Sequence, residues 1–135
     1  MRRIALACAF IALATPSIGS AQLLTTKLYN FVDTPLSVTY SSSGQAQLKI
    51  SPPNAIISVT GYRKVSIRIG STHATTLQVH MGKISNATLS QRIFNGPIPQ
   101  TIRTFDVVGP ELVIWLMGAP ANSTEQVQIW VYLTT

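Results

Sequence analysis

The clearest pattern in this sequence is an alternation of apolar and other residues over positions 125–133. The residues of one parity are Val127, Ile129, Val131 and Leu133, and those of the other are Gln126, Gln128, Trp130 and Tyr132. A period of two over this length predicts a β-strand with one face on a hydrophobic core. We therefore expect the apolar row to be buried and Trp130 and Tyr132 to lie on the outer face.

Short segments with a similar period recur along the chain, separated by turns rich in Gly, Pro, Asn and Ser. They are expected at residues 25–32, 36–40, 45–50, 55–60, 65–69, 77–81, 87–94, 101–108 and 112–117. The segment 112–117 is apolar at both parities, which is typical of a central strand covered on both sides. No segment after residue 21 has a helical period.

Two packed antiparallel sheets bury the apolar faces of this many strands, whereas a single flat sheet would expose them. We therefore predict an all-β fold, an antiparallel jelly-roll-type β-sandwich of about 8–10 short strands. It forms one domain over residues 22–135. A small closed barrel is the alternative architecture.

Segments 65–69 and 77–81 both place their apolar residues at odd positions, which is compatible with a hairpin between them. A loop of residues 72–74 keeps both apolar rows on one face, and a slip of one residue would bury the polar row. This register gives two outer-face pairs: Arg68 with Gln78, and Ser66 with His80.

The first 21 residues have the layout of a secretory signal peptide. Arg2 and Arg3 precede an apolar run over residues 4–14, and small residues lead up to a cleavage point after Ala21. The run is shorter than the roughly 20 residues of a membrane helix. We therefore expect cleavage, a secreted or periplasmic location, and no membrane span in the mature chain.

The single cysteine, Cys8, lies within this leader, so the mature chain is expected to have no disulfide. The formal net charge is +6, and it becomes +4 once Arg2 and Arg3 are removed. The remaining basic residues are spread along the chain and form no basic run. The sequence therefore predicts no nucleic-acid site and only a mild attraction to anionic surfaces.

The acidic residues and histidines form no pattern that predicts catalysis or metal binding. Asp106 and Glu111 are the only local pair of carboxylates, and solvated strand ends explain them better than glycoside hydrolysis. Glu125 is likewise expected in water at the start of a strand. His73 and His80 would lie about 20 Å apart along a strand, too far to share a metal ion. With no nucleophile elbow and no phosphate-binding loop, we expect no enzyme, catalytic residue, metal or cofactor.

The outer face of the last strand carries the candidate binding residues. Exposed Trp and Tyr combine apolar area with a hydrogen-bonding tip, and neighbouring amide and guanidinium groups can bind sugar hydroxyls. The predicted ligand-binding residues are Trp130, Tyr132, Gln128, Arg68 and His80. If the strands of Trp115 and Trp130 pair, Trp115 belongs either to the core row or to the face of Trp130, depending on a register that the sequence leaves open. The two strands can also lie in different sheets.

Three segments and the closing apolar strand resemble the strand order of galactose-binding-like (discoidin-type) jelly-roll domains. The segments are residues 62–69, 76–79 and 105–112. The resemblance implies a jelly roll with paired terminal strands and ligand binding by loops at one end of the sandwich. This chain lacks the family's frequent cysteine bridge and is short by its standard, so no binding residues carry over.

Together these patterns predict a secreted, non-catalytic binding module whose ligand is a carbohydrate or a cell-surface glycan. The alternative is a structural or assembly subunit that uses the same aromatic face to contact a protein partner or to form a homo-oligomer. A third outcome is that another strand, loop or subunit covers this face and Trp130 is part of a core.

Overall fold

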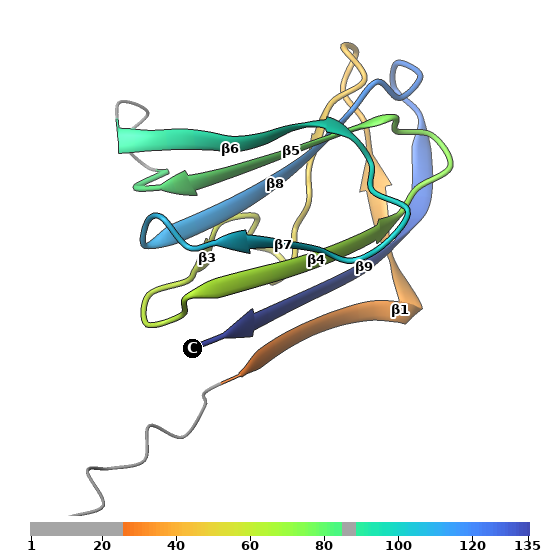
Figure 1. Ribbon diagram of the computed structural model, residues 1–135. Helices are drawn as coiled ribbons and strands as arrows, with labels where there is room; N and C mark the ends of the chain where they lie inside the picture. The colour runs from red at the N-terminus through yellow and green to blue at the C-terminus, as the bar shows by residue number, and fades with distance from the viewer. Residues whose placement is uncertain (1–25, 85–88) are drawn as a thin grey trace, which may run out of the picture.

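The computed structural model describes residues 26–84 and 89–135 of the 135-residue chain (Figure 1). The expected signal peptide, residues 1–21, lies outside the described residues. Within the described ranges the chain forms nine β-strands and no α-helix, so the prediction of an all-β fold is confirmed. None of the described segments is a helix with the length and apolar character needed to cross a membrane.

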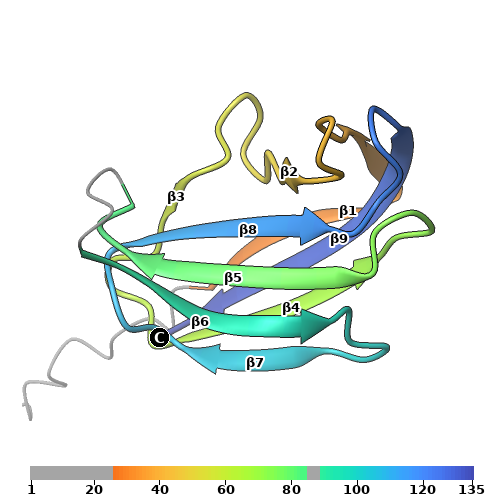
Figure 2. The same ribbon diagram turned by 90° about the horizontal axis from the view of Figure 1, so that it is seen from above.

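The strands form two antiparallel sheets that pack face to face (Figure 1). The first, which we call the β9 sheet, has the order β1 (Lys27–Thr39), β9 (Thr124–Thr134), β4 (Lys64–Gly70) and β7 (Arg103–Asp106). The second, the β8 sheet, has the order β2 (Ala46–Gln47), β8 (Glu111–Met117), β5 (Thr76–Gly82) and β6 (Ser90–Pro97), and β3 (Ile57–Ser58) also pairs with β8. Figure 2 shows β8, β5 and β6 running side by side.

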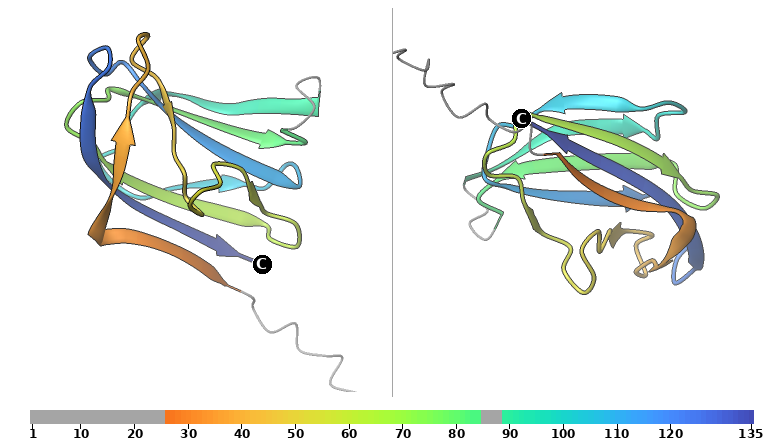
Figure 3. Two further views of the ribbon diagram at one scale, coloured as in Figure 1. Left: turned by 180° about the vertical axis from the view of Figure 1, so that it is seen from behind. Right: turned by 90° about the horizontal axis from the view of Figure 1, so that it is seen from below.

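This strand order is that of a jelly roll if β2 and β3 are counted as one interrupted strand. The chain then passes from one sheet to the other at most of its connections, and the two sheets interleave in sequence. The first and last strands, β1 and β9, pair along most of their length (Figure 3). The predicted jelly-roll-type sandwich is therefore confirmed, and the barrel alternative is wrong.

The inward rows of both sheets form one hydrophobic core. In the β9 sheet, Val127, Ile129, Val131 and Leu133 are completely buried, as the alternation predicts. Across the core, the β8 sheet contributes a matching set of buried side chains: Leu77, Val79, Met81, Leu112, Ile114 and Leu116. The described chain has no disulfide. The burial and close packing of these two rows of apolar side chains are therefore the main source of its stability.

The hairpin expected between β4 and β5 is wrong. β4 pairs with β9 and β7, whereas β5 pairs with β6 and β8, and residues 71–75 carry the chain across from one sheet to the other. Both odd-numbered rows are buried as predicted, but they face each other across the core. Two strands can bury their odd-numbered residues in one core either by pairing side by side or by facing each other across it. The alternation of apolar residues therefore could not distinguish the two arrangements. The observed partners of Arg68 and Ser66 on β9 are Trp130 and Tyr132.

The other boundaries differ from the sequence prediction in ways that follow from strand pairing. The two segments expected at 25–32 and 36–40 form the single edge strand β1, with a register shift between Phe31 and Leu36. An edge strand tolerates Pro35 there because its N–H side need not complete a ladder. β2 and β3 have only two ladder residues each. The core nevertheless includes Leu48, Ile50 and Val59, which are fully buried. In this part of the chain the alternation of apolar residues therefore correctly indicates which side chains are buried, although few residues pair in a regular strand.

The chain crosses from β6 to β7 through residues 98–102, and aromatic contacts anchor this crossing. The rings of Phe94 and Phe105 have centroids 5.6 Å apart, and the Arg103 guanidinium lies 4.3 Å from the centre of the Phe94 ring. Such contacts hold the edge strands of the two sheets together. They also position residues 98–100 as part of the wall of the site described next.

Candidate functional site

The outer face of the β9 sheet carries a stacked pair of aromatic side chains. The rings of Trp130 and Tyr132 have centroids 5.5 Å apart with 27° between their planes, and both side chains are half-buried. Because β9 is an inner strand of the sheet, Trp130 lies opposite Arg68 of β4 on one side and Asn30 of β1 on the other. Trp130 is therefore on the outer face, as predicted. We call Trp130, Tyr132 and their outer-face neighbours the aromatic face.

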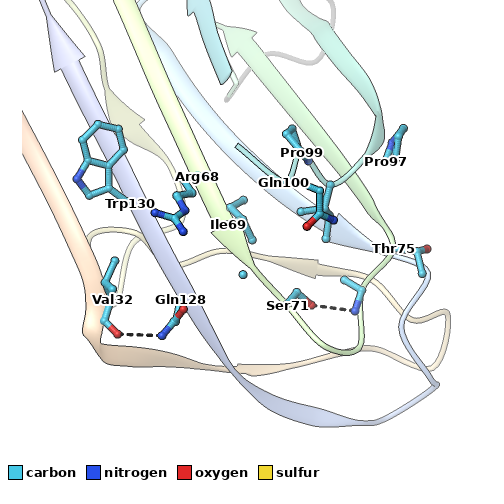
Figure 4. A pocket seen from close by; sticks show the side chains of 13 residues that line it. Val32, Arg68, Ile69, Ser71, Thr75, Pro97, Pro99, Gln100, Gln128 and Trp130 are labelled. Atoms are coloured by element: carbon cyan, nitrogen blue, oxygen red, sulfur yellow. Dashed lines mark hydrogen bonds between the residues drawn. The ribbon is translucent and has the colours of Figure 1, made fainter. Parts of the chain in front are cut away.

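A groove of about 460 Å³ opens beside Trp130 (Figure 4). On one side of it lie residues of the β9 sheet, and on the other side lie residues of the segments 71–75 and 97–100, from the end of β6 and the two crossings between the sheets. The first group is Val32, Arg68, Ile69, Gly70, Gln128 and Trp130, and the second is Ser71, Ala74, Thr75, Pro97, Ile98, Pro99 and Gln100. The groove is thus built by segments from four separate parts of the chain.

Two polar side chains of the β9 sheet face this groove beside the indole. Gln128 donates a hydrogen bond from Nε2 to the carbonyl of Val32 at 3.3 Å, which fixes the amide and leaves Oε1 as an acceptor (Figure 4). Arg68 is exposed, and the one salt bridge within the described chain joins Lys64 to Asp106 instead. The guanidinium therefore offers a fork of N–H donors next to an aromatic ring, a combination that binds hydroxyl or carboxylate oxygens.

A buried carboxylate holds the end of the groove in place. Glu125 was expected in water, but it is only 8% exposed, and this expectation is wrong. Its carboxylate accepts hydrogen bonds from the hydroxyls of Tyr40, Ser71 and Thr72 and from the backbone N–H groups of Thr72 and His73. This network ties the crossing at residues 71–75 to the start of β9. A buried charge is tolerated here because its oxygens are saturated with donors.

The hydrogen bonds also govern the ionisation of this carboxyl. Burial alone raises the pKa of Glu125, but the hydrogen bonds from Ser71, Tyr40 and Thr72 outweigh it and lower the pKa to about 2. Two effects raise the pKa of the Tyr40 phenol well above its usual value: burial, which is the larger, and the hydrogen bond to Glu125. The pair is therefore a neutral donor and an ionised acceptor across the ordinary pH range.

The structure brings four of the five predicted binding residues together. Trp130, Gln128 and Arg68 line the groove, and Tyr132 stacks on Trp130 beside it. His80 is not part of this group, because β5 belongs to the β8 sheet. The expected outer-face pairing of Ser66 with His80 is therefore wrong.

His80 and Trp115 share the outer face of the β8 sheet. The Nε2 atom of His80 lies 3.3 Å from Oε1 of Gln78, and burial together with nearby Arg92 lowers the pKa of the imidazole. Trp115 lies directly opposite Gln78 and is half-buried. The sequence left three places open for Trp115, and the structure shows the third: β8 and β9 lie in different sheets, so Trp115 joins neither the core row nor the face of Trp130.

The groove also contains residues that sequence analysis did not identify. The segment 97–100, with two prolines, was predicted only as part of a loop, and Ser71 and Thr75 were predicted to close a hairpin. One signal for Glu125 was present: it has the same parity as the buried row of β9 and therefore points inward.

Neither paired acids nor a metal-binding cluster accompanies the groove. Asp106 pairs with Lys64, and Glu111 accepts a hydrogen bond from the N–H of Ile84 at 2.6 Å. Over residues 26–84 and 89–135, no group of three or more His, Cys, Asp or Glu side chains is arranged to hold a metal ion.

Comparison with known proteins gives no family for this chain. No family model matches the sequence, and no curated protein sequence matches it. Among solved structures, the chain is similar to CBM86, a low-affinity xylan-binding module from Roseburia intestinalis, with 16% sequence identity and a TM-score of 0.43. The match covers 82% of this chain and 96% of that module. A likeness this distant supports no conclusion about the ligand, and the resemblance to galactose-binding-like domains extends only to the jelly-roll sandwich.

Proposed function

We propose that this protein is a non-catalytic carbohydrate-binding module, secreted or periplasmic, that holds a glycan in the groove beside Trp130. The observation that carries the proposal is the position of a polar-lined groove directly against a stacked Trp–Tyr pair. In this arrangement the apolar face of a sugar ring lies on the indole, and its hydroxyls reach the Arg68 guanidinium and the Gln128 amide.

Stacking on an indole suits a sugar because both surfaces are rigid. The Trp130 ring is held by its contact with Tyr132 and by its place on an inner strand, so little side-chain entropy is lost when a ligand binds. The Gln128 amide is already oriented by its bond to Val32. A preorganised aromatic ring with fixed polar groups is the kind of surface that recognises a polar, ring-shaped ligand.

The same lining favours binding over catalysis. The 13 residues of the groove include Ser, Thr, Gln, Arg and Trp, but no Asp, Glu or His. Glycoside hydrolysis normally uses a pair of carboxyl groups flanking the scissile bond, and general acid–base catalysis needs a titratable group near the operating pH. The groove therefore has groups that hold a glycan but none suited to cleave it by that chemistry.

A glycan array followed by calorimetry on residues 22–135 tests the proposal. We expect binding to at least one neutral oligosaccharide, in a panel that includes xylan fragments. W130A should weaken that binding about fivefold or more, because a stacked aromatic at the centre of a site supplies ~1–3 kcal/mol. W115A, which removes the same side chain from the opposite sheet, is the matched control and should bind the neutral ligand normally. The proposal would be contradicted if the wild-type protein bound no glycan, or if both variants lost the same amount of affinity for the neutral ligand.

A second candidate function, assembly through the aromatic face, has one observation in its favour. Leu28 lies opposite Tyr132 on the edge strand β1 and is 50% exposed, so apolar surface extends from the aromatic pair to the edge of this sheet. Light scattering separates the two functions. A stable oligomer that both W130A and L28A dissociate supports assembly, whereas a monomer at all concentrations excludes a homo-oligomer.

The proposed location has its own test. Expression of the full chain in a bacterial host, followed by fractionation and N-terminal sequencing, should recover a mature protein that begins at Gln22. Retention of residues 1–21 on protein in the cytoplasm would contradict a cleaved signal peptide.

A further inference from the structure

The outer face of the β8 sheet carries a second aromatic ring in a polar setting. Trp115 of β8 lies opposite Gln47 of β2 on one side and Gln78 of β5 on the other, and Gln78 lies opposite Asn95 of β6. These four residues therefore form one row across the sheet. With strands about 4.8 Å apart, the row is roughly 14 Å long.

Two of the three amides of this row, those of Gln78 and Asn95, are held by hydrogen bonds. Gln78 donates from Nε2 to Oδ1 of Asn95 at 3.1 Å, and its Oε1 lies 3.3 Å from Nε2 of His80. Gln47 and Asn95 are exposed, and Trp115 is half-buried. The row thus combines an aromatic ring with amides of fixed orientation that water can reach, and such preorganisation lowers the entropic cost of binding.

A broad hollow of about 650 Å³ adjoins the indole of Trp115. It extends over Gln47 and Gln45 toward the end of β1, and Lys49 is the only charged side chain among its described lining residues. The Lys49 side chain is exposed to solvent. A ligand that lies on Trp115 therefore meets one ammonium group and several neutral polar groups.

No Asp or Glu side chain is among the described residues that line this hollow. Asp106 pairs with Lys64 on the β9 sheet, and Asp33 belongs to β1 at the register shift. Glu125 accepts a hydrogen bond from Tyr40, a lining residue, but its carboxylate is buried behind the surface and saturated with donors. Glu111 is bound to the N–H of Ile84 and lies four residues from Trp115 on β8, about 13 Å along the strand. The exposed charge that a ligand meets among the described lining residues is therefore the Lys49 ammonium group, and charge complementarity favours an anionic ligand.

We infer that this face is a second carbohydrate site, specific for an acidic glycan. A sugar ring stacks on Trp115, its hydroxyls meet the amides of Gln47 and Gln78, and its carboxylate or sulfate is held by Lys49. The site lies on the opposite sheet from the groove of Trp130 and takes a ligand of different charge. The two proposed sites can therefore be tested independently.

Calorimetry with a galacturonic acid trimer and its fully methyl-esterified form tests this inference. The two probes share a backbone and differ in charge. The wild-type protein should prefer the acidic trimer, and the preference should shrink between about 50 mM and about 500 mM salt, as screening shortens the range of the Lys49 charge. K49Q should reduce affinity for the acidic trimer about fivefold and leave affinity for the ester unchanged. W115A should weaken binding of the acidic trimer, and W130A should leave that binding unchanged.

Three outcomes would overturn the inference. In the first, the acidic trimer does not bind the wild-type protein. In the second, K83Q, which removes one exposed lysine outside the hollow, lowers affinity as much as K49Q; binding would then reflect net charge alone. In the third, W130A abolishes binding of the acidic trimer, which would place the ligand in the other groove. If W115A fails to fold, the exposed substitution K49Q with its control K83Q still decides the result.

Discussion

Tyr40 and Glu125 lie 85 positions apart in the chain, yet the phenol hydroxyl of Tyr40 donates a hydrogen bond to the Glu125 carboxylate inside the sandwich. Tyr40 follows the end of β1, and Glu125 lies near the start of β9, so the bond locks the pairing of the first and last strands. The same carboxylate holds Ser71 and Thr72. One buried acid thus connects the closing strand pair to the crossing that bounds the groove.

We expect E125Q to lower the free energy of unfolding by about 3 kcal/mol. Glutamine keeps the shape but loses the charge, and its N–H₂ group faces neighbours that are themselves donors. Urea denaturation of the mature chain measures the loss. E111Q is the matched control, because Glu111 accepts one hydrogen bond from the N–H of Ile84 and is expected to cost about 1 kcal/mol. Equal losses in the two variants would contradict a special role for Glu125.

The pH dependence of stability follows from the same network. The pKa of Glu125 falls from 4.5 to about 2 on folding, so the folded state favours the ionised form. Its contribution is fully present above about pH 4.5 and is lost as the pH falls toward 2; it amounts to on the order of 3 kcal/mol. Urea unfolding of wild type and E125Q at several pH values should show their difference shrinking over this window. A difference that stays constant down to about pH 2 would contradict the assigned pKa.

Engineered cysteine pairs test the strand partners directly. Ser66 and Thr104 are opposed on β4 and β7, with their hydroxyl oxygens 2.8 Å apart. The double variant S66C/T104C should therefore form a disulfide under mild oxidation, because its sulfur atoms can reach bonding distance without backbone movement. S66C/H80C, the pair that a β4–β5 hairpin would join, should keep both thiols free. Since residues 22–135 contain no other cysteine, mass spectrometry after thiol alkylation reads each outcome without ambiguity. The reverse result would exclude this topology.

Single-tryptophan variants assign ligands to faces, given the proposed function. W115F leaves Trp130 as the only indole, and W130F leaves Trp115. A neutral oligosaccharide that stacks in the groove should change the fluorescence of W115F and leave that of W130F unaltered, because indole emission responds to local desolvation. Titration of both variants with the neutral ligand found on the array measures this. A response from W130F alone would move the neutral site to the β8 sheet.

The site shows where sequence reasoning succeeds. Alternation along β9 correctly placed Trp130, Tyr132 and Gln128 on the outer face, because side-chain direction in a strand is a local property with a period of two. Parity also placed Arg68 on an outer face. Parity also indicates that Glu125 points inward, but we predicted a solvent-exposed side chain because charged groups generally prefer water. That prediction was wrong because hydrogen-bond donors from distant parts of the chain stabilise the buried carboxylate.

The sequence by itself determined the fold class, the members of the core and the outward direction of the aromatic pair, since each depends on the spacing of apolar residues along one strand. Only the tertiary structure decided that β4 pairs with β9, that His80 and Trp115 lie on the other sheet, and that residues 97–100 wall a groove beside Trp130. The physical reason is that two strands with buried odd-numbered rows satisfy the same core whether they pair side by side or face each other across it. The choice depends on the packing of all the strands together, which no local pattern records.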